Sequence, residues 1–213
     1  MRTTKTIEAI DKAMISENAK DPVRYHLGYS LIGNECTRQL WYTFRWVDSP
    51  SHSGRLLRLF QRGHLEEERF VYFLEKAGIQ VWATDENGQQ FKVAPEECGG
   101  HFGGSTDGVG LGFPEDPQAP MLIEMKTHSG KSFKDLEKNG VAVSKPQHLA
   151  QMLGYCHQMN LPKAFYMAVN KDNDDLYTEV IEADTQAAEG LIARAKQIIT
   201  SDRPLQKMSQ DPT

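Results

Sequence analysis

The sequence predicts one α/β domain with a mixed central β-sheet flanked by helices. Two observations support this fold class. Helical and strand-like segments follow each other in the order helices, strands, helix, strands, helix. The 213 residues suffice for one well-packed core and are too few for two comfortable ones. We therefore expect residues 1–213 to form a single domain, with a core over about residues 30–185 and helical extensions at both ends.

Three helices are expected before the first strand. Residues 4–19 have fair helical content, and the aromatic-rich segment that follows contains a helix beginning near residues 34–35. The third helix covers about residues 54–77. It closes on Gly78, because glycine readily adopts the left-handed conformation that ends many helices.

Four short strand-like segments occupy the middle of the chain. They are the segments IQVWAT, QQFKVA, GSTDGVGLG and MLIEMKTH, at residues 79–84, 89–94, 104–112 and 121–128. A turn over residues 113–120 separates the last two.

The C-terminal part supplies the remaining helices and strands. Residues 131–138 are compatible with a short helix. Ser144 is expected to cap a longer helix that has Pro146 in its first turn and runs to about residue 160. Two strands and a final helix complete the fold, at residues 163–170, 175–182 and 185–201.

Composition and charge exclude several classes of protein. A hydrophobic fraction of 39% and a charged fraction of 25% are typical of a soluble globular protein. No apolar run could span a bilayer and no signal peptide is apparent, so we expect no membrane association. The expected location is the cytoplasm, or the host cytoplasm if the chain is phage-encoded. A net charge of −5 argues against coating of nucleic acid by bulk charge, but it is compatible with DNA binding in a local groove.

The candidate chemistry centres on Asp107, Glu124 and Lys126. Glu124 and Lys126 are two residues apart on an apolar strand, so their side chains share one face, while Ile123 and Met125 point to the other. Burial of such charges is costly unless they are paired or bind a metal. Together with Asp107, they offer two carboxylates for Mg²⁺ or Mn²⁺ and a lysine that can orient water beside a phosphate. A surface ion pair is the alternative.

Two helices could complete this site. The apolar stripe of the helix over 54–77 directs Glu67 toward the core, with Glu66 and Glu68 about 100° to either side. Glu67 is then either a third acidic group at the metal or a core-edge glutamate paired with an arginine. The later helix has a polar stripe that could contact phosphates or the catalytic lysine, with a solvated face as the alternative. That stripe consists of His148, Gln151, Tyr155 and Gln158.

In this order, the motifs resemble the PD-(D/E)XK nuclease superfamily, most closely its RecB-like and YqaJ-like phage exonuclease branch. The matching motifs are Gly63-x-x-x-Glu67, Thr106-Asp107-Gly108, Glu124-Met125-Lys126 and Gln151-x-x-x-Tyr155. Residues 32–42 resemble the N-terminal Cys-x-Arg segment of many phage members, and residues 147–171 resemble the family's helix-then-strand ending. The resemblance therefore spans about residues 30–171. Thr106 replaces the proline that precedes the aspartate in the family motif.

The resemblance implies a restriction-endonuclease-like core and a metal-dependent DNA exonuclease, acting in phage or prophage recombination or in DNA end processing. It implies one or more Mg²⁺ (or Mn²⁺) ions held by Asp107, Glu124 and the Met125 carbonyl, with Glu67 completing the site. Lys126 would serve the attacking water. The implied partners are DNA and a recombination or single-strand-binding protein.

Residues around this centre follow from the resemblance and from the polar stripe. The resemblance implies that Gln151 and Tyr155 flank the site and that Arg38 touches a DNA phosphate, while the stripe adds His148 as a substrate-binding candidate. Some RecB-like nucleases carry a [4Fe–4S] cluster on one N-terminal and three C-terminal cysteines. No cysteine follows Cys156 here, so we expect no iron–sulfur cluster and interpret Cys36 as a small buried residue.

Two alternatives to an exonuclease remain. One is a structure-specific or restriction-type DNA endonuclease, and the other is a nucleic-acid-binding module with a vestigial nuclease site. The complete set of aspartate, glutamate and lysine argues against a vestigial site, because a decayed site usually loses at least one ligand.

Overall fold

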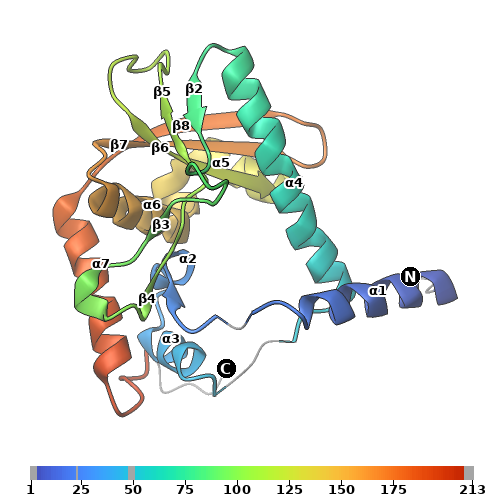
Figure 1. Ribbon diagram of the computed structural model, residues 1–213, viewed down its shortest axis with the longest axis vertical. Coiled ribbons are helices and arrows are strands. Elements are labelled where there is room, and N and C mark those ends of the chain that lie inside the picture. Colours follow the sequence, from blue (N-terminus) through green and yellow to red (C-terminus); the bar gives the residue numbers. More distant parts are fainter. Residues whose placement is uncertain (1–3, 23, 48–50, 209–213) are drawn as a thin grey trace.

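A five-stranded mixed sheet forms the centre of the molecule (Figure 1). The computed structural model describes residues 4–22, 24–47 and 51–208. The strand order is β2–β5–β6–β7–β8, and β6 and β7 are parallel whereas the other neighbours are antiparallel. The predicted mixed α/β architecture is therefore confirmed. The five strands are β2 Gln80–Trp82, β5 Val109–Leu111, β6 Met121–His128, β7 Lys163–Asn170 and β8 Leu176–Glu182.

Helices cover both faces of this sheet. Helix α4 (Gly54–Lys76) packs on one face, where its Phe70 and Leu74 join Ile123 and Met125 of β6 in one apolar cluster. Helices α5 (Gly130–Ser144) and α6 (Pro146–Met159) connect β6 to β7 and cover the opposite face. A crossover of this kind is required because parallel neighbours cannot be joined by a tight turn.

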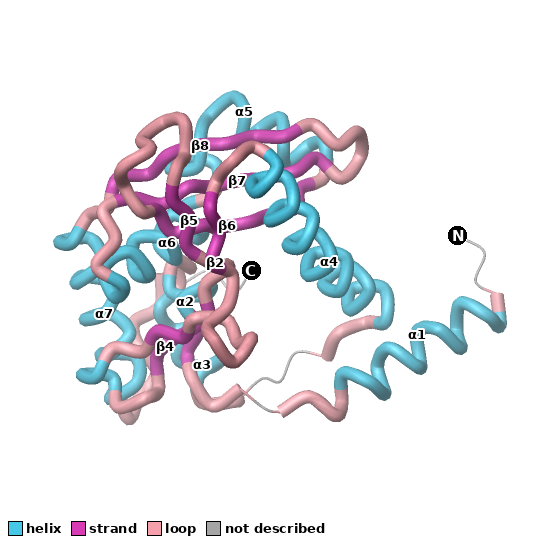
Figure 2. The backbone as a smooth tube through the Cα atoms, turned by 45° about the horizontal axis from the view of Figure 1, so that its top comes forward, coloured by secondary structure: helices cyan, strands magenta, loops and turns pink. Residues whose placement is uncertain are grey.

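The outer parts of the fold are built on these layers. Helix α7 (Thr185–Thr200) packs against α6. A small second sheet has the order β1–β4–β3. Helix α1 contacts the N-terminal end of α4 and projects from the rest of the molecule (Figures 1 and 2). The remaining elements are α1 Lys5–Asn18, β1 Leu27–Gly28, α2 Tyr29–Ile32, α3 Thr37–Phe44, β3 Lys92–Val93, the 3₁₀ turn η1 Glu96–Cys98 and β4 Phe102–Ser105.

The strand expected over residues 104–112 is in fact two strands. Strand β4 ends at Ser105, β5 begins at Val109, and the two belong to different sheets. The break falls at Gly108, whose φ is +143° and where a Cβ would lie 2.7 Å from the Trp82 carbonyl oxygen. Only glycine fits this bend, so the chain changes sheets there and leaves Asp107 between them.

The prediction that Ser144 caps the following helix is wrong. Helix α5 is longer than expected and ends at Ser144, so Lys145 takes the N-cap position of α6. The chain departs from helical geometry at Gly140, with φ +70°, and continues as one further turn. The other end of α6 is as predicted, because Asn160 ends the helix in the left-handed conformation.

None of the helices in the described ranges is long and apolar enough to cross a membrane.

Candidate active site

Strand β6 brings Glu124 and Lys126 together on its face toward α6. Glu124 is completely buried, with 0% of its surface exposed. The Lys126 ammonium forms an ion pair with Glu124 Oε1, lies 3.7 Å from Asp107 Oδ2 and donates a hydrogen bond of 3.1 Å to the Met125 carbonyl. The structure therefore places the three residues predicted for the catalytic centre in one constellation.

The bend between β4 and β5 directs Asp107 at β6. Its Oδ2 accepts a hydrogen bond of 2.7 Å from the backbone N–H of Met125. The backbone N–H of Thr106, the residue before Asp107, donates a hydrogen bond of 3.0 Å to the Phe91 carbonyl and so fixes the start of the bend. One oxygen of Asp107 is thus held by the strand that carries the other two catalytic candidates.

Burial and mutual charge set the electrostatics of this constellation. Burial raises the pKa of Glu124, and the neighbouring charge of Asp107 adds to that effect, while Lys126 opposes both. Burial alone would lower the pKa of Lys126, but the carboxylates of Glu124 and Asp107 outweigh it and raise that pKa. The ammonium therefore offsets part of the cost of burying the Glu124 carboxylate.

Three oxygen atoms converge on the cation at this point. They belong to Asp107, Glu124 and the Met125 carbonyl, and the Lys126 ammonium occupies their focus. Neither oxygen of Glu124 accepts a well-directed hydrogen bond from any residue that the structure describes. Within the described ranges, no three His, Cys, Asp or Glu side chains form a metal site by themselves. The donor set nevertheless fits Mg²⁺ or Mn²⁺, which prefer oxygen ligands, once Lys126 turns aside.

Glu67 reaches this site from α4. It lines a pocket of about 320 Å³ together with Asp107, Gln151 and Tyr155. Burial raises the pKa of Glu67, and the charge of Asp107 raises it further. Glu67 thus faces the same space as Asp107 and is available as a further oxygen donor.

The prediction that Glu67 alone of the three glutamates points into the core is wrong. Glu66 is the most buried of them, and its carboxylate accepts a hydrogen bond of 2.8 Å from Arg69. The alternative of a core-edge glutamate paired with arginine therefore describes Glu66. Glu67 is half-buried and turned one helical step away, toward the pocket.

Gln151 and Tyr155 lie on α6 where the sequence placed them, but on a buried face. Both line the pocket beside Asp107. A side chain at Gly104 of β4 would overlap the Tyr155 hydroxyl, so the glycine allows the phenol to approach the strand. Burial raises the pKa of Tyr155, which keeps its hydroxyl protonated.

His148 lies behind the site, outside the residues that line the pocket. Its Nδ1 is 3.0 Å from the hydroxyl of Tyr166, and Nε2 of His128 is 2.8 Å from the same hydroxyl. Tyr166 pairs with Glu124 in the parallel register of β6 and β7. Burial and the charges of nearby lysines lower the pKa of His148 to about 3 and that of His128 to about 4. Both imidazoles are therefore neutral.

The structure does not bring Arg38 to the pocket. Its guanidinium donates to the Leu205 carbonyl at 3.0 Å and to the Tyr42 hydroxyl at 3.2 Å, which ties α3 to the C-terminal segment. Arg24 lines the pocket instead. It stands in a short segment before β1 that has no helical or strand periodicity, and the sequence analysis missed it.

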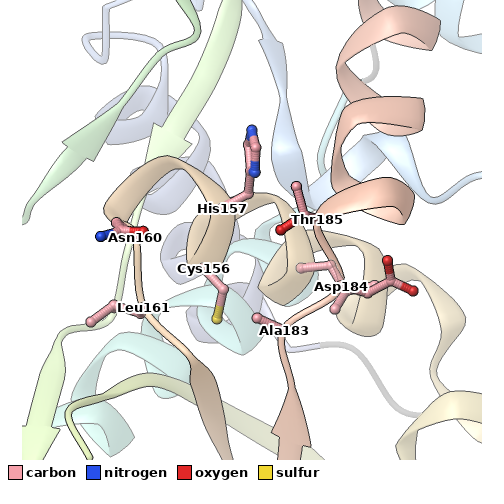
Figure 3. A pocket seen from close by; sticks show the side chains of 8 residues that line it. Cys156, His157, Asn160, Leu161, Ala183, Asp184 and Thr185 are labelled. Atoms are coloured by element: carbon pink, nitrogen blue, oxygen red, sulfur yellow. The ribbon is translucent and has the colours of Figure 1, made fainter.

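Neither Cys36 nor Cys156 has the surroundings of a reactive thiol. Cys36, expected to be buried, is partly exposed, and its sulfur caps α3 by accepting from the Gln39 N–H. Cys156 lines a small separate pocket between α6 and α7, where the His157 imidazole points away from the thiol (Figure 3). Burial raises the pKa of the Cys156 thiol to about 12, so it stays protonated.

Comparisons with known proteins find similarity in structure alone. No protein-family model and no curated protein sequence matches this chain. The alkaline exonuclease LHK-Exo from Laribacter hongkongensis aligns over 90% of each chain with a TM-score of 0.54 and 14% identity. A structure of LHK-Exo in complex with dAMP gives a TM-score of 0.56 and 15% identity, also over 90% of each chain. The protein SSO0001 aligns over 94% of this chain and 89% of its own, with a TM-score of 0.50 and 14% identity. The chain shares the fold of these proteins, and the expected restriction-endonuclease-like core is confirmed.

Proposed function

We propose that this chain is a Mg²⁺- or Mn²⁺-dependent DNA nuclease that hydrolyses phosphodiester bonds as an exonuclease. The observation that carries the proposal is the convergence of the Asp107, Glu124 and Met125 oxygens on the Lys126 ammonium, next to an open pocket. The fold shared with an alkaline exonuclease whose structure contains dAMP supports the same class of reaction.

Each residue of the constellation has a distinct role in this proposal. The carboxylates of Asp107 and Glu124 and the Met125 carbonyl hold the metal, and Glu67 completes the oxygen set from the pocket side. When bound, the metal would polarise a phosphoryl oxygen and lower the pKa of a bound water. Lys126, displaced from the carboxylates, orients the attacking water and offsets the charge that develops on the phosphate.

The rest of the pocket is suited to a phosphate group. Arg24 supplies a positive charge, and Ser30 and Ser105 line the same space and supply hydroxyl donors. Tyr29 also lines the pocket, and its hydroxyl is buried and has no hydrogen-bond partner among the described residues. We infer that these groups bind the phosphodiester next to the one that is cut.

The buried side of the site positions the catalytic groups. Gln151 and Tyr155 flank Asp107 and keep bulk water from the carboxylates. His128 and His148 hold Tyr166 against the strand that carries Glu124. His148 is thereby assigned a supporting role in place of substrate contact.

The biological role that we propose is DNA end processing or recombination in a phage or prophage, in company with a recombination or single-strand-binding protein. It rests on the motif resemblance to the RecB-like and YqaJ-like exonucleases. An exonuclease needs a free DNA end, which separates it from the endonuclease alternative.

One assay tests these readings together. Linear and covalently closed circular DNA are incubated with the protein in Mg²⁺, Mn²⁺, Ca²⁺ or excess chelator. We expect loss of linear DNA alone in Mg²⁺ or Mn²⁺, and binding without cleavage in Ca²⁺. Cleavage of both substrates would favour an endonuclease, and binding without cleavage in every metal would favour a vestigial site.

Matched variants assign the activity to this site. Asp107→Asn removes a proposed ligand, whereas Asp174→Asn changes an exposed aspartate that pairs with Arg69. We expect the first change to abolish cleavage and the second to leave it intact. Cleavage that survives Asp107→Asn would assign the activity to another site or to a contaminant.

A further inference from the structure

An exposed aromatic pair lies at the surface beside the N-terminal end of β4. Tyr25 is 72% exposed and Trp46 is 44% exposed, and their ring centroids are 5.2 Å apart with 31° between the planes. Phe44, Arg45 and His101 line the same shallow, largely apolar depression. The two rings lie tilted against each other and both remain open to solvent, so they form an aromatic platform at the surface.

The backbone at Trp46 is unusual for its residue type. Helix α3 ends in a Schellman motif, in which the Trp46 N–H donates to the Thr43 carbonyl and the Val47 N–H donates to the Tyr42 carbonyl. Trp46 has φ +56°, at the position of the motif that glycine usually occupies. A bulky residue in the left-handed region is a genuine outlier and points to a use for its side chain.

The platform adjoins, through neighbouring residues of the chain, a cleft that leads to the candidate active site. Tyr25 stands between Arg24 and His26, which line a cleft together with Lys92. That cleft and the active-site pocket share the residues Arg24 and 103–105. The chain from His101 at the platform through β4 to Asp107 is six residues long and therefore spans at most about 20 Å, at roughly 3.3 Å per residue. This length accommodates a few nucleotides.

The chemistry along this path fits a DNA strand. Arg24, His26 and Lys92 offer hydrogen-bond donors, two of them permanently charged, over the middle of the path, where a phosphate backbone would run. The aromatic rings at its end offer a flat apolar surface. Arg45 lies over Phe44 and is fixed by hydrogen bonds to the Ile199 and Ser201 carbonyls, so it holds the floor of the depression rigid.

We propose that Tyr25 and Trp46 stack an unpaired nucleobase of the DNA strand that occupies the active site. This inference rests on the proposed nuclease function and adds a second contact point, a few nucleotides from the cleavage position. Stacking on an aromatic platform is tolerant of sequence, because every base has a π-face. The platform therefore binds single-stranded DNA without selecting a sequence.

The test compares normal and abasic single strands. A fluorescently labelled thymidine oligonucleotide and an abasic oligonucleotide of the same length are titrated with the full chain in chelator, and anisotropy reports binding. We expect Tyr25→Ala and Trp46→Ala each to weaken binding of the thymidine strand about tenfold and to leave binding of the abasic strand unchanged. Tyr72→Ala and Trp82→Ala are the controls, because these residues are 55% and 40% exposed and lie outside the platform.

A second variant separates recognition from folding. Trp46→Gly places glycine where the Schellman motif favours it, so the melting temperature should be maintained while thymidine-strand binding falls as in Trp46→Ala. If Trp46 is only structural, the glycine variant will bind normally. A wild-type chain that binds the two strands equally would overturn the platform, as would a loss that affects both strands alike or wild-type binding by both platform variants.

The failure of this inference is distinguishable from that of the proposed function. Metal-dependent cleavage of linear DNA by the wild-type chain tests the nuclease independently of stacking. Cleavage with no preference for the thymidine strand would overturn the platform and leave the nuclease standing. The absence of both cleavage and binding would overturn both proposals, and preferential binding without cleavage would overturn the nuclease alone.

Discussion

Replacing Lys126 with methionine tests whether this lysine is the counter-ion of a buried carboxylate. The apolar neighbours of Lys126 anchor β6 and by themselves predict that its removal costs little stability. The structure changes that expectation, since Glu124 is completely buried and Lys126 is the cation paired with it. Lys126→Met keeps most of the side-chain volume and leaves the Glu124 charge uncompensated. We expect the variant to lose cleavage in Mg²⁺, and to be less stable than the wild type in the absence of metal.

The size of the effect follows from the geometry. Breaking a buried ion pair by removing one partner costs about 3–5 kcal/mol, and the partial exposure of Lys126 places this case near 3 kcal/mol. For a chain of this length, each kcal/mol shifts the melting temperature by about 2–4 °C, so a fall of about 6–12 °C is expected. The deficit should be largest at pH 8 and should shrink as the pH falls. Burial raises the pKa of Glu124 above that of an unfolded glutamate, so its protonation on acidification relieves the uncompensated charge.

The assay is thermal unfolding in chelator and again in Mg²⁺, with two controls. Lys134→Met changes an exposed lysine and should alter stability by no more than about 0.5 kcal/mol. The double variant Glu124→Gln/Lys126→Met also removes the uncompensated charge of Glu124, so it should recover most of the lost melting temperature. Mg²⁺ should stabilise Lys126→Met more than the wild type, because the metal restores positive charge among the same oxygens. A single variant that melts within about 2 °C of the wild type at pH 8 in chelator would refute the reasoning.

Three further predictions concern the surroundings of this pair. Glu67→Gln should raise the Mg²⁺ concentration for half-maximal cleavage about tenfold, whereas Glu68→Gln, on the exposed face of α4, should change it less than twofold. A metal titration in which the two variants shift this concentration equally would contradict the assigned phase of α4. Arg24→Ala should weaken DNA binding at every sequence and reduce the slope of log affinity against log salt by about 1, and an unchanged slope would remove Arg24 from the phosphate path. His128 and His148 have pKa values of about 4 and about 3 in the folded protein, below the ordinary 6.5. As the pH drops below 6.5, the unfolded chain binds protons at these histidines and the folded protein does not, so the stability should fall. The fall is about 1.4 kcal/mol per pH unit for each histidine, and His148→Gln should make it shallower in melting curves between pH 7.5 and pH 5.

The central strands could be predicted closely because their signal is local. The apolar runs of β6 and β7 coincide with the predicted ranges 121–128 and 163–170. The alternation within β6 placed Glu124 and Lys126 on one face and Ile123 on the other, as the two apolar clusters on opposite faces show. A two-residue period needs no knowledge of the rest of the chain.

The phase of α4 could not be read in the same way. The apolar stripe that predicts Glu67 at the core includes Phe60. This residue is exposed, because the N-terminal part of α4 extends beyond the sheet toward α1 (Figure 1). The face of α4 that packs on the sheet is instead marked by Phe70 and Leu74. A single periodicity fitted over both parts of the helix therefore displaced the predicted buried glutamate from Glu66 to Glu67.

The pocket residues were missed for another reason. Arg24, Ser30 and Ser105 meet Asp107 only through the small second sheet, whose strands β1 and β3 have two residues each. Strands this short carry no periodic signal, and their pairing depends on contacts between distant segments. Motif spacing could locate the catalytic constellation but not the groups that face it across the pocket.

The parallel pairing of β6 with β7 determines when the candidate site comes into existence during synthesis. Its residues are supplied by α4, by the bend before β5, by β6 and by α6, and α6 lies in the crossover that β7 must close. Non-local pairings of this type form late, after the intervening chain has been made. We therefore expect Asp107, Glu124 and Lys126 to meet Gln151 and Tyr155 only after residues up to about 170 have been synthesised. The site therefore assembles late, when the central sheet is nearly complete.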